Sequence, residues 1–170
     1  AGRIIFLPQK PYMALFGSLR EQMLFPLPAQ PKTHAAPVDT DSQTNASSNK
    51  GGKYGGVAGS NESKVGDDIP PEKFREALKT AALGELAYRF SLDDKIAWED
   101  VLSLGQQQRL TLARLFLREN VSIAFLDEAT SACDSITEKA VYEAIQKHVP
   151  CYISIAHRVR SLLKFHTHVL

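Results

Sequence analysis

Residues 101–134 read V-L-S-L-G-Q-Q-Q-R-L-T-L-A-R-L-F-L-R-E-N-V-S-I-A-F-L-D-E-A-T-S-A-C-D, and this stretch decides how the rest of the chain folds. A Ser-x-Gly-Gln turn at 103–106 leads into a helical pattern, and the apolar run 121–126 ends at Asp127 and Glu128. The first N–H groups of a helix are unpaired and its dipole is positive there, so the turn suits an anion. The carboxylates follow a strand, at the edge where open α/β sheets bind ligands. Both halves of the stretch therefore suit phosphate chemistry.

Strands and helices alternate around this stretch. The apolar runs 4–7 and 121–126 predict buried strands, and residues 151–156 predict a further strand. Capping boxes at 18–21 and 135–138 predict two helix starts. This alternation predicts an α/β fold with a mostly parallel sheet.

Apolar residues at helical spacing mark further helices. A helix that proline opens and Gly84 ends has four such positions, Phe74, Leu78, Ala81 and Ala82. A second helical patch covers 86–90. The helix after the Ser-x-Gly-Gln turn has an apolar face at Leu110, Ala113 and Leu117. The helix after residue 135 has one at Ala140, Val141, Ala144 and Ile145.

Composition narrows the function classes. The 170 residues carry 20 basic and 19 acidic side chains, a net charge of +1 that gives no electrostatic case for nucleic acid as a partner. Two scattered cysteines predict neither a disulfide framework nor a metal site. No apolar run approaches the roughly 20 residues of a membrane-spanning helix. The chain opens without Met, inside a strand pattern, and we expect both of its ends to be cut.

Residues 31–68 differ from the rest, being rich in Ser, Asn, Thr and Gly. A segment so poor in large apolar residues cannot offset its ordering entropy, so we expect a disordered low-complexity insertion. Its Gly51-Gly52-Lys53 does not fit a phosphate-binding loop, because Ser47 and Tyr54 stand where that motif needs Gly and Ser or Thr.

Each candidate residue also has a purely structural interpretation. Asp127 and Glu128 fit an acidic turn before a helix, and Ser103 fits an N-cap without a ligand. His157 fits a helix-terminal histidine. As neighbours on a strand, Asp127 and Glu128 are expected to point to opposite faces and to do different jobs.

Four motifs in a fixed order carry a resemblance. Residues 102–109, L-S-L-G-Q-Q-Q-R, resemble the signature of ABC-type ATPases, and 125–134, F-L-D-E-A-T-S-A-C-D, resemble the Walker B strand joined to the D-loop. Residues 6–9, F-L-P-Q, resemble the Q-loop, and 155–158, I-A-H-R, the H-loop. P-Q-K-P-Y-M at 8–13 and other details are similar to subfamily D, the peroxisomal type, with its bacterial and plastid relatives.

The resemblance implies a role for each matched residue. Glu128 would be the general base, His157 would contact the γ-phosphate, and Gln9 would contact Mg²⁺ and the attacking water. Asp127 would help to hold Mg²⁺. The remaining residues would meet the opposite domain: the signature Ser103, Leu104, Gly105 and Gln106 would contact its ATP, and the D-loop Ser131 and Asp134 would lie at the interface.

The implied fold is a P-loop NTPase-like (ABC ATPase) parallel sheet with an α-helical subdomain, incomplete at its N-terminus. Residues 1–170 would be a partial ATP-binding domain without a Walker A loop, with 69–118 as helical subdomain and 119–170 carrying Walker B, D-loop and H-loop. The implied cofactors are ATP and Mg²⁺. The implied partners are a second nucleotide-binding domain and the transmembrane domain of the same transporter, on the cytosolic side of a peroxisomal, plastid or plasma membrane.

Departures from the family pattern leave alternatives. Leu104 replaces a usual Gly and Cys133 a usual Leu, and no Gly-rich phosphate loop lies in the 170 residues, so we expect the isolated chain to bind ATP negligibly. The leading hypothesis is a transporter ATPase domain, with fatty acid or acyl-CoA among the family's substrates. A non-transport ABC ATPase of the DNA-repair or ribosome-associated kind, and a truncated inactive binding module, are the alternatives.

Overall fold

The computed structural model describes residues 2–26 and 68–169, so the insertion predicted at 31–68 lies outside this range except for Asp68. The elements, in chain order, are β1 (Arg3–Leu7), α1 (Leu19–Leu24), α2 (Pro71–Thr80), α3 (Gly84–Arg89), α4 (Trp98–Val101), α5 (Leu104–Leu117), β2 (Val121–Asp127), α6 (Ser135–His148), β3 (Tyr152–Ile155), α7 (Val159–Leu162) and a short 3-10 helix (Leu163–Phe165). The α/β fold class is confirmed.

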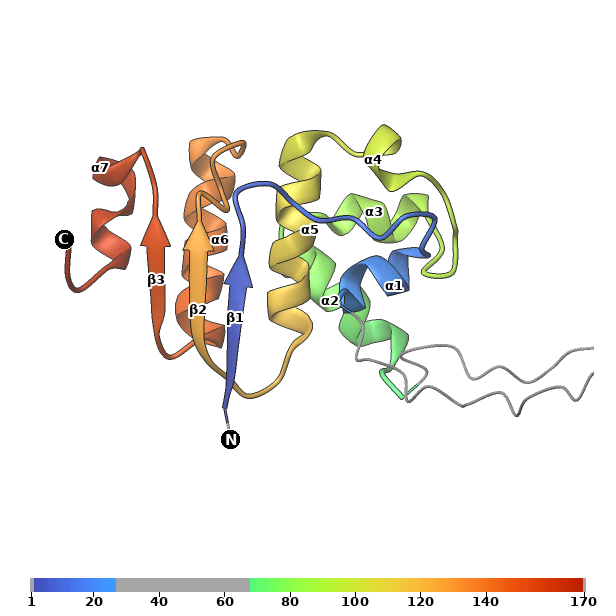
Figure 1. The fold of residues 1–170 in the computed structure, drawn as a ribbon, viewed down its shortest axis with the longest axis horizontal. Helices are drawn as coiled ribbons and strands as arrows, with labels where there is room; N and C mark the ends of the chain where they lie inside the picture. The colour runs from blue at the N-terminus through green and yellow to red at the C-terminus, as the bar shows by residue number, and fades with distance from the viewer. Residues whose placement is uncertain (1, 27–67, 170) are drawn as a thin grey trace, which may run out of the picture.

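The sheet has the order β1-β2-β3 in the described residues, and both strand pairs are parallel. Leu7 is in register with Leu126, and Asp127 with Ile155. All three strands therefore end at one edge, which Figure 1 shows at the top together with the first turns of α5 and α6. Loops that leave this edge are the ones that position the candidate site.

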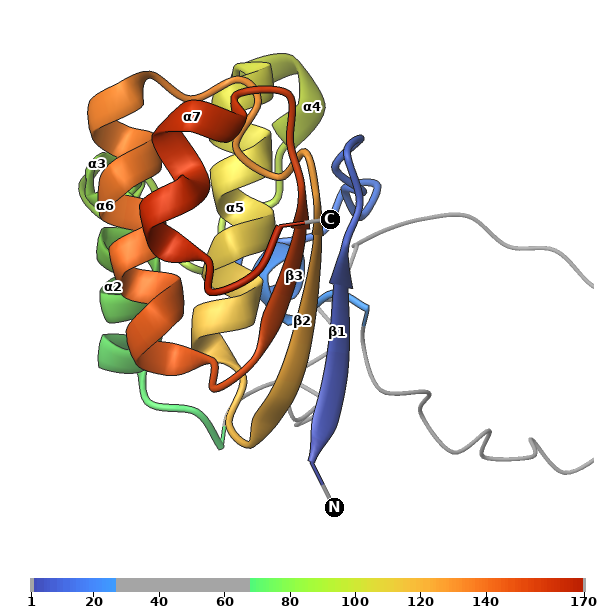
Figure 2. The same cartoon turned by 90° about the vertical axis from the view of Figure 1, so that its left-hand side faces the viewer.

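The helices lie on one side of this sheet, as Figure 2 shows with the strands seen edge-on. The other face is apolar and open in the described residues: Ile4 is 69% exposed and Ile155 is 62% exposed. The prediction of buried strands at 4–7 and 121–126 therefore holds for only one face of the sheet in the described residues. Side chains alternate along a strand, and helices cover only one of the two faces in residues 2–26 and 68–169.

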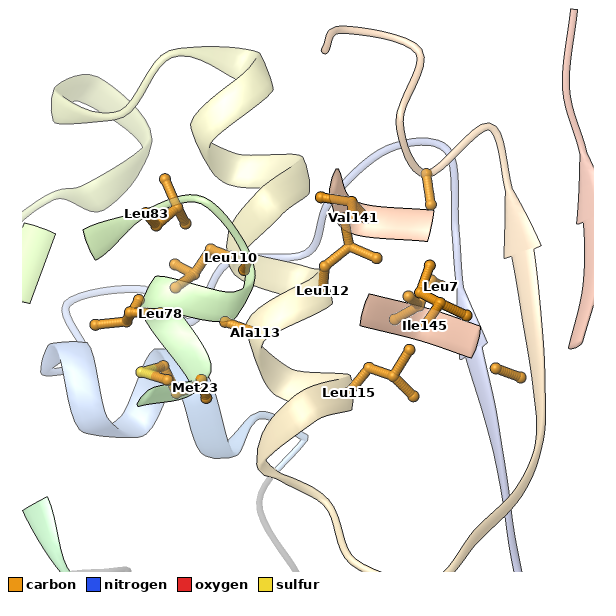
Figure 3. Packing of buried hydrophobic residues seen from close by; sticks show 14 of the residues in the cluster. Leu7, Met23, Leu78, Leu83, Leu110, Leu112, Ala113, Leu115, Val141 and Ile145 are labelled. Atoms are coloured by element: carbon orange, nitrogen blue, oxygen red, sulfur yellow. The ribbon is translucent and has the colours of Figure 1, made fainter. Parts of the chain in front are cut away.

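Helix α5 is the centre of the hydrophobic core. One of its sides packs toward α1 and α2 through Leu110 and Ala113, and another packs toward α6 and β1 through Leu112 and Leu115 (Figure 3). All four of these side chains are at most 1% exposed. Burying a leucine contributes about 1.5–3 kcal/mol, so this central helix is firmly held.

The capping box at 18–21 is confirmed, because Ser18 caps α1 and Glu21 bonds back to the Ser18 N–H. Contrary to the prediction, Gly84 does not end α2. The helix ends at Thr80, the left-handed residue that follows its C-cap is Ala82 with a φ of 55°, and Gly84 begins α3. Helix α4 was not anticipated. No helix in residues 2–26 and 68–169 is long and apolar enough to cross a membrane.

The predicted capping box at 135–138 was also wrong. Asp134 is the N-cap of α6, and its carboxylate accepts from the N–H groups of Ile136 and Thr137. The N-cap is therefore one residue earlier than predicted, and Glu138 does not bond back to it. The buried carboxylate of Glu138 instead accepts from the hydroxyls of Thr130 and Ser161. The buried face of α6 comprises Glu138, Val141, Tyr142 and Ile145, and Ala140 is exposed.

Candidate active site

Each of the three parallel strands delivers one polar side chain just beyond its carboxyl end. Gln9 follows β1, Glu128 follows β2 and His157 follows β3. Nε2 of Gln9 donates to Oε2 of Glu128 at 2.8 Å, and Nε2 of His157 lies 2.7 Å from Oε1 of the same carboxylate. The structure thus brings together three residues that are far apart in the sequence, with one carboxylate between an amide and an imidazole.

Glu128 is held in a constrained backbone conformation. Its φ is 48°, its N–H donates to the carbonyl of Ile155 at 2.9 Å, and its own carbonyl accepts from the N–H of Ser131 at 3.0 Å. A left-handed conformation outside glycine costs on the order of 1–3 kcal/mol and is typical of functional sites. The expectation from strand alternation does not apply, because β2 ends at Asp127 and Glu128 has already left the strand.

The side chains of Glu128 and His157 differ in exposure. The side chain of Glu128 is 14% exposed, whereas that of His157 is 85% exposed. A shielded carboxylate beside an accessible imidazole can act on a bound water while the imidazole contacts a ligand that arrives from solvent.

Two oxygen donors at this edge fit a magnesium ion. Asp127 is the last residue of β2, and Gln9 bonds Glu128 through its nitrogen, which leaves its amide oxygen as a donor. Mg²⁺ takes one or two protein oxygens, several waters and substrate phosphates. The described residues hold no group of three or more His, Cys, Asp or Glu side chains around a common point.

The Ser-x-Gly-Gln turn forms the start of α5 through a reciprocal capping box. Oγ of Ser103 accepts from the N–H of Gln106 at 3.3 Å, and Oε1 of Gln106 accepts from the N–H of Ser103 at 3.0 Å. Leu104 is 57% exposed. No hydrogen bond in the described part of the chain joins Ser103 or Gln106 directly to Gln9, Glu128 or His157. The turn and the carboxylate site are separate features.

Gly105 allows a close backbone approach beside this turn. A Cβ at Gly105 would lie 2.9 Å from the carbonyl oxygen of Ala132, closer than real side chains come. The loop at 131–134 thus packs directly on the first turn of α5. Glycine is required here by space, since its backbone φ is not in the left-handed region.

The loop that carries Ser131 and Asp134 is fixed from two further sides. The guanidinium of Arg158 donates to the carbonyls of Ser131 at 2.6 Å and Cys133 at 2.9 Å. Asp134 anchors the other end as the cap of α6, and its bonds to the Thr137 N–H and hydroxyl lower the pKa of its carboxyl. Burial raises the pKa of the Cys133 thiol, so this cysteine is a packing residue rather than a reactive one.

Sequence reasoning gave no role to Gln108, which lies between these features. Its side chain is 2% exposed and bonds Ser131 Oγ at 3.0 Å, the Ala132 N–H at 3.0 Å and the Gln9 carbonyl at 3.3 Å. Its helical spacing could have predicted its burial, because Gln108 shares a helical face with the buried Leu112 and Leu115. A polar side chain buried on an apolar face needs hydrogen-bond partners, and here the two loops provide them.

The chain is similar in sequence to ABC transporters. No family model matches the chain. The chain is 42% identical over 99% of its length to "ABC transporter D family member 2, chloroplastic" of Arabidopsis thaliana, covering 22% of that protein. It is 37% identical over 98% of its length to "Lysosomal cobalamin transporter ABCD4" of Homo sapiens, again covering 22%. The chain thus spans about a fifth of the length of the curated relatives it matches.

A solved structure of a bacterial Atm1-family ABC exporter with ATP bound has the same fold. Its TM-score is 0.58 at 19% identity, over 94% of this chain and 22% of that one. The similarity supports the fold class predicted from the sequence, a parallel sheet of the P-loop NTPase type with accompanying helices.

Proposed function

We propose, from the premise that the chain is a homologue of the nucleotide-binding domains of ABC transporters, that it forms part of a domain whose ATP hydrolysis drives transport across a membrane. The single observation that carries the proposal is the position of Glu128. Its carboxylate lies between Gln9 and His157 at the carboxyl edge of three parallel strands, where α/β folds of this type bind ligands.

Glu128 is the proposed general base. Its carboxylate accepts the proton of the attacking water, and the amide of Gln9 orients that carboxylate. The largely exposed ring of His157 would contact the γ-phosphate, and the contact of its Nε2 with Glu128 keeps it next to the base. Mg²⁺, held by Asp127 and Gln9 together with the nucleotide, would neutralise charge on the phosphates.

The first turn of α5 is the proposed contact for ATP on a second nucleotide-binding domain. The capping box satisfies the N–H groups of Ser103 and Gln106, which leaves those of Leu104 and Gly105 to face a phosphate. No hydrogen bond joins the turn to Gln9, Glu128 or His157 in the described residues, so we assign the two features to two different nucleotides. Ser131 and Asp134 would lie between them, at the interface of the two domains.

The transported substrate and the membrane are proposed from the relatives. The subfamily D resemblance supports a fatty acid or acyl-CoA, and the human relative's name offers cobalamin as the competing substrate. The chloroplastic name of the Arabidopsis relative supports a plastid membrane, with this domain on its cytosolic side. The non-transport alternatives have no support among these relatives.

The test is steady-state phosphate release by the full-length protein in a lipid bilayer. Glu128→Gln keeps the size of the side chain and removes the base, so turnover should fall by about 10²–10⁴-fold. Glu143→Gln is the matched control, because Glu143 is half-exposed on α6 and pairs with Lys139 only at 3.8 Å. Turnover of the Glu128 variant within threefold of wild type would remove Glu128 from this role.

A further inference from the structure

One buried amide joins the loops of the candidate site to the helix that begins at Ser103. The Nε2 group of Gln108 donates to Ser131 Oγ at 3.0 Å and contacts the carbonyls of Gln9 at 3.3 Å and Glu128 at 3.5 Å. Its Oε1 accepts from the N–H of Ala132 at 3.0 Å. An amide nitrogen has two hydrogens, so the two longer contacts share one, and the Ser131 and Ala132 bonds are the firm ones.

Helix α5 contacts the main chain of Ala132 through two residues one turn apart, Gly105 and Gln108. The carbonyl of Ala132 lies against Gly105, where a Cβ would meet it at 2.9 Å, and its N–H is bonded by Gln108. Residues three apart on a helix lie on the same face, so both contacts move together when α5 moves. The 131–134 loop cannot follow a different path without breaking one of them.

The same side chain touches the main chain of both Gln9 and Glu128. These are the residues whose side chains form the 2.8 Å bond between amide and carboxylate. The Glu128 backbone is in a left-handed conformation that needs support from its surroundings, and the Gln108 amide is part of that support. A displacement of α5 can therefore reach the Gln9–Glu128 pair through this buried amide.

We propose that Gln108 is a positioning residue that sets the geometry of the base Glu128 and links it to the first turn of α5. The inference rests on the proposed function. Contact of that turn with a nucleotide on a second domain would be transmitted through Gln108 to the carboxylate of this domain. Gln108 itself touches no reacting atom in this account, and it acts through the loops that it holds.

The experiment compares Gln108→Met with Gln107→Met in the full-length protein, by kcat and KM for Mg-ATP and by the melting temperature. Methionine keeps the length and bulk of glutamine and removes every hydrogen bond of the amide. Gln107 is the matched control, because it is the next residue on α5 and its amide bonds two main-chain carbonyls, of Glu99 and Leu102, away from Glu128. Glu128→Gln is measured alongside.

We expect Gln108→Met to lower kcat by about 10–10²-fold with KM within twofold of wild type, since a misplacement on the order of 1 Å has effects of this size. Gln107→Met should leave kcat within twofold. A general loss of folding would lower the melting temperature and the active fraction, but it would not change kcat per active site while sparing KM. A kcat for Gln108→Met within twofold of wild type would overturn the proposal.

Ser131→Ala keeps the test decisive if Gln108→Met does not fold. Removing the Ser131 hydroxyl breaks one firm bond of the Gln108 amide, so kcat should fall about threefold or more with KM retained. Where both variants fold, the double variant should be no slower than Gln108→Met alone, because the two residues act through one connection. An unchanged kcat in Ser131→Ala, or effects that multiply in the double variant, would overturn the proposal.

Glu128→Gln separates this inference from the proposed function. If Glu128→Gln is inactive and Gln108→Met retains full kcat, the positioning role fails and the base assignment stands. If Glu128→Gln retains full kcat, both fail together.

Discussion

Gln9 and Glu128 are 119 positions apart in the sequence, and their side chains meet at 2.8 Å. The parallel register of β1 on β2 makes this possible, because Leu7 and Leu126 are paired and the next few residues of each strand leave the sheet together. His157 completes the arrangement from β3 through its 2.7 Å contact with Glu128. The site is therefore a direct product of sheet topology.

Replacing His157 by alanine should lower ATP turnover of the full-length protein by roughly 10²-fold, the usual effect of losing one preorganised donor to a developing charge. The imidazole contacts Glu128 and remains exposed toward a ligand. Steady-state phosphate release at saturating Mg-ATP measures the change. His168→Ala is the control, since His168 is exposed and its ring contacts the neighbouring Thr167. Equal turnover in the two variants would contradict the role of His157.

Gly105→Ala should destabilise the protein by about 1–3 kcal/mol, because the new methyl group would lie 2.9 Å from the Ala132 carbonyl in a well-packed region. Thermal unfolding measures this effect. Gly84→Ala is the matched control, since a Cβ there meets nothing closer than 3.9 Å and alanine favours the helical backbone. We expect the control to be neutral or slightly stabilising. A Gly105→Ala protein as stable as the control would contradict the close approach of the loop.

Asp134→Asn should make the free energy of unfolding depend less on pH in the acid range. The Thr137 N–H and hydroxyl lower the pKa of the Asp134 carboxyl below its ordinary value of 3.8 in the folded protein. A carboxyl whose folded pKa is lowered stabilises the fold above its unfolded pKa, and this contribution disappears as pH falls from about 3.8 through the folded value. Asparagine still caps the helix but does not titrate in this range. Identical acid-unfolding curves for the two proteins would exclude this contribution.

The parts of the fold that follow from local chemistry could be predicted from the sequence. The three strands follow from their apolar runs, and the cap at Ser18 follows from Glu21 three residues later, since each of these signals is local. The motif resemblance supplied Gln9, Glu128 and His157, and their close contact agrees with one shared site. The roles assigned to these residues stay predictions.

The parts that depend on competition between neighbours could not be predicted. Asp134 and Ser135 are both good caps, and only the path of the loop decides for Asp134, whose carboxylate reaches two N–H groups. Ala82 adopts a left-handed conformation that glycine normally takes, so Gly84 gave a misleading signal for the end of α2. Gln108 was missed because its partners lie in two separate loops, after β1 and after β2, and no local pattern brings those together with α5.

The central claim, that Glu128 removes the proton from the attacking water, is tested most directly by a single turnover of prebound ATP. The full-length Glu128→Gln protein should bind Mg-ATP with nearly wild-type affinity, because glutamine keeps the size of the side chain and its amide oxygen still accepts one of the two hydrogen bonds that the carboxylate accepts. Cleavage of that bound ATP, followed by rapid quench, should be slower than wild type by at least about 10²-fold. Cleavage at the wild-type rate would contradict the account, and a loss of ATP affinity without slower cleavage would contradict it equally.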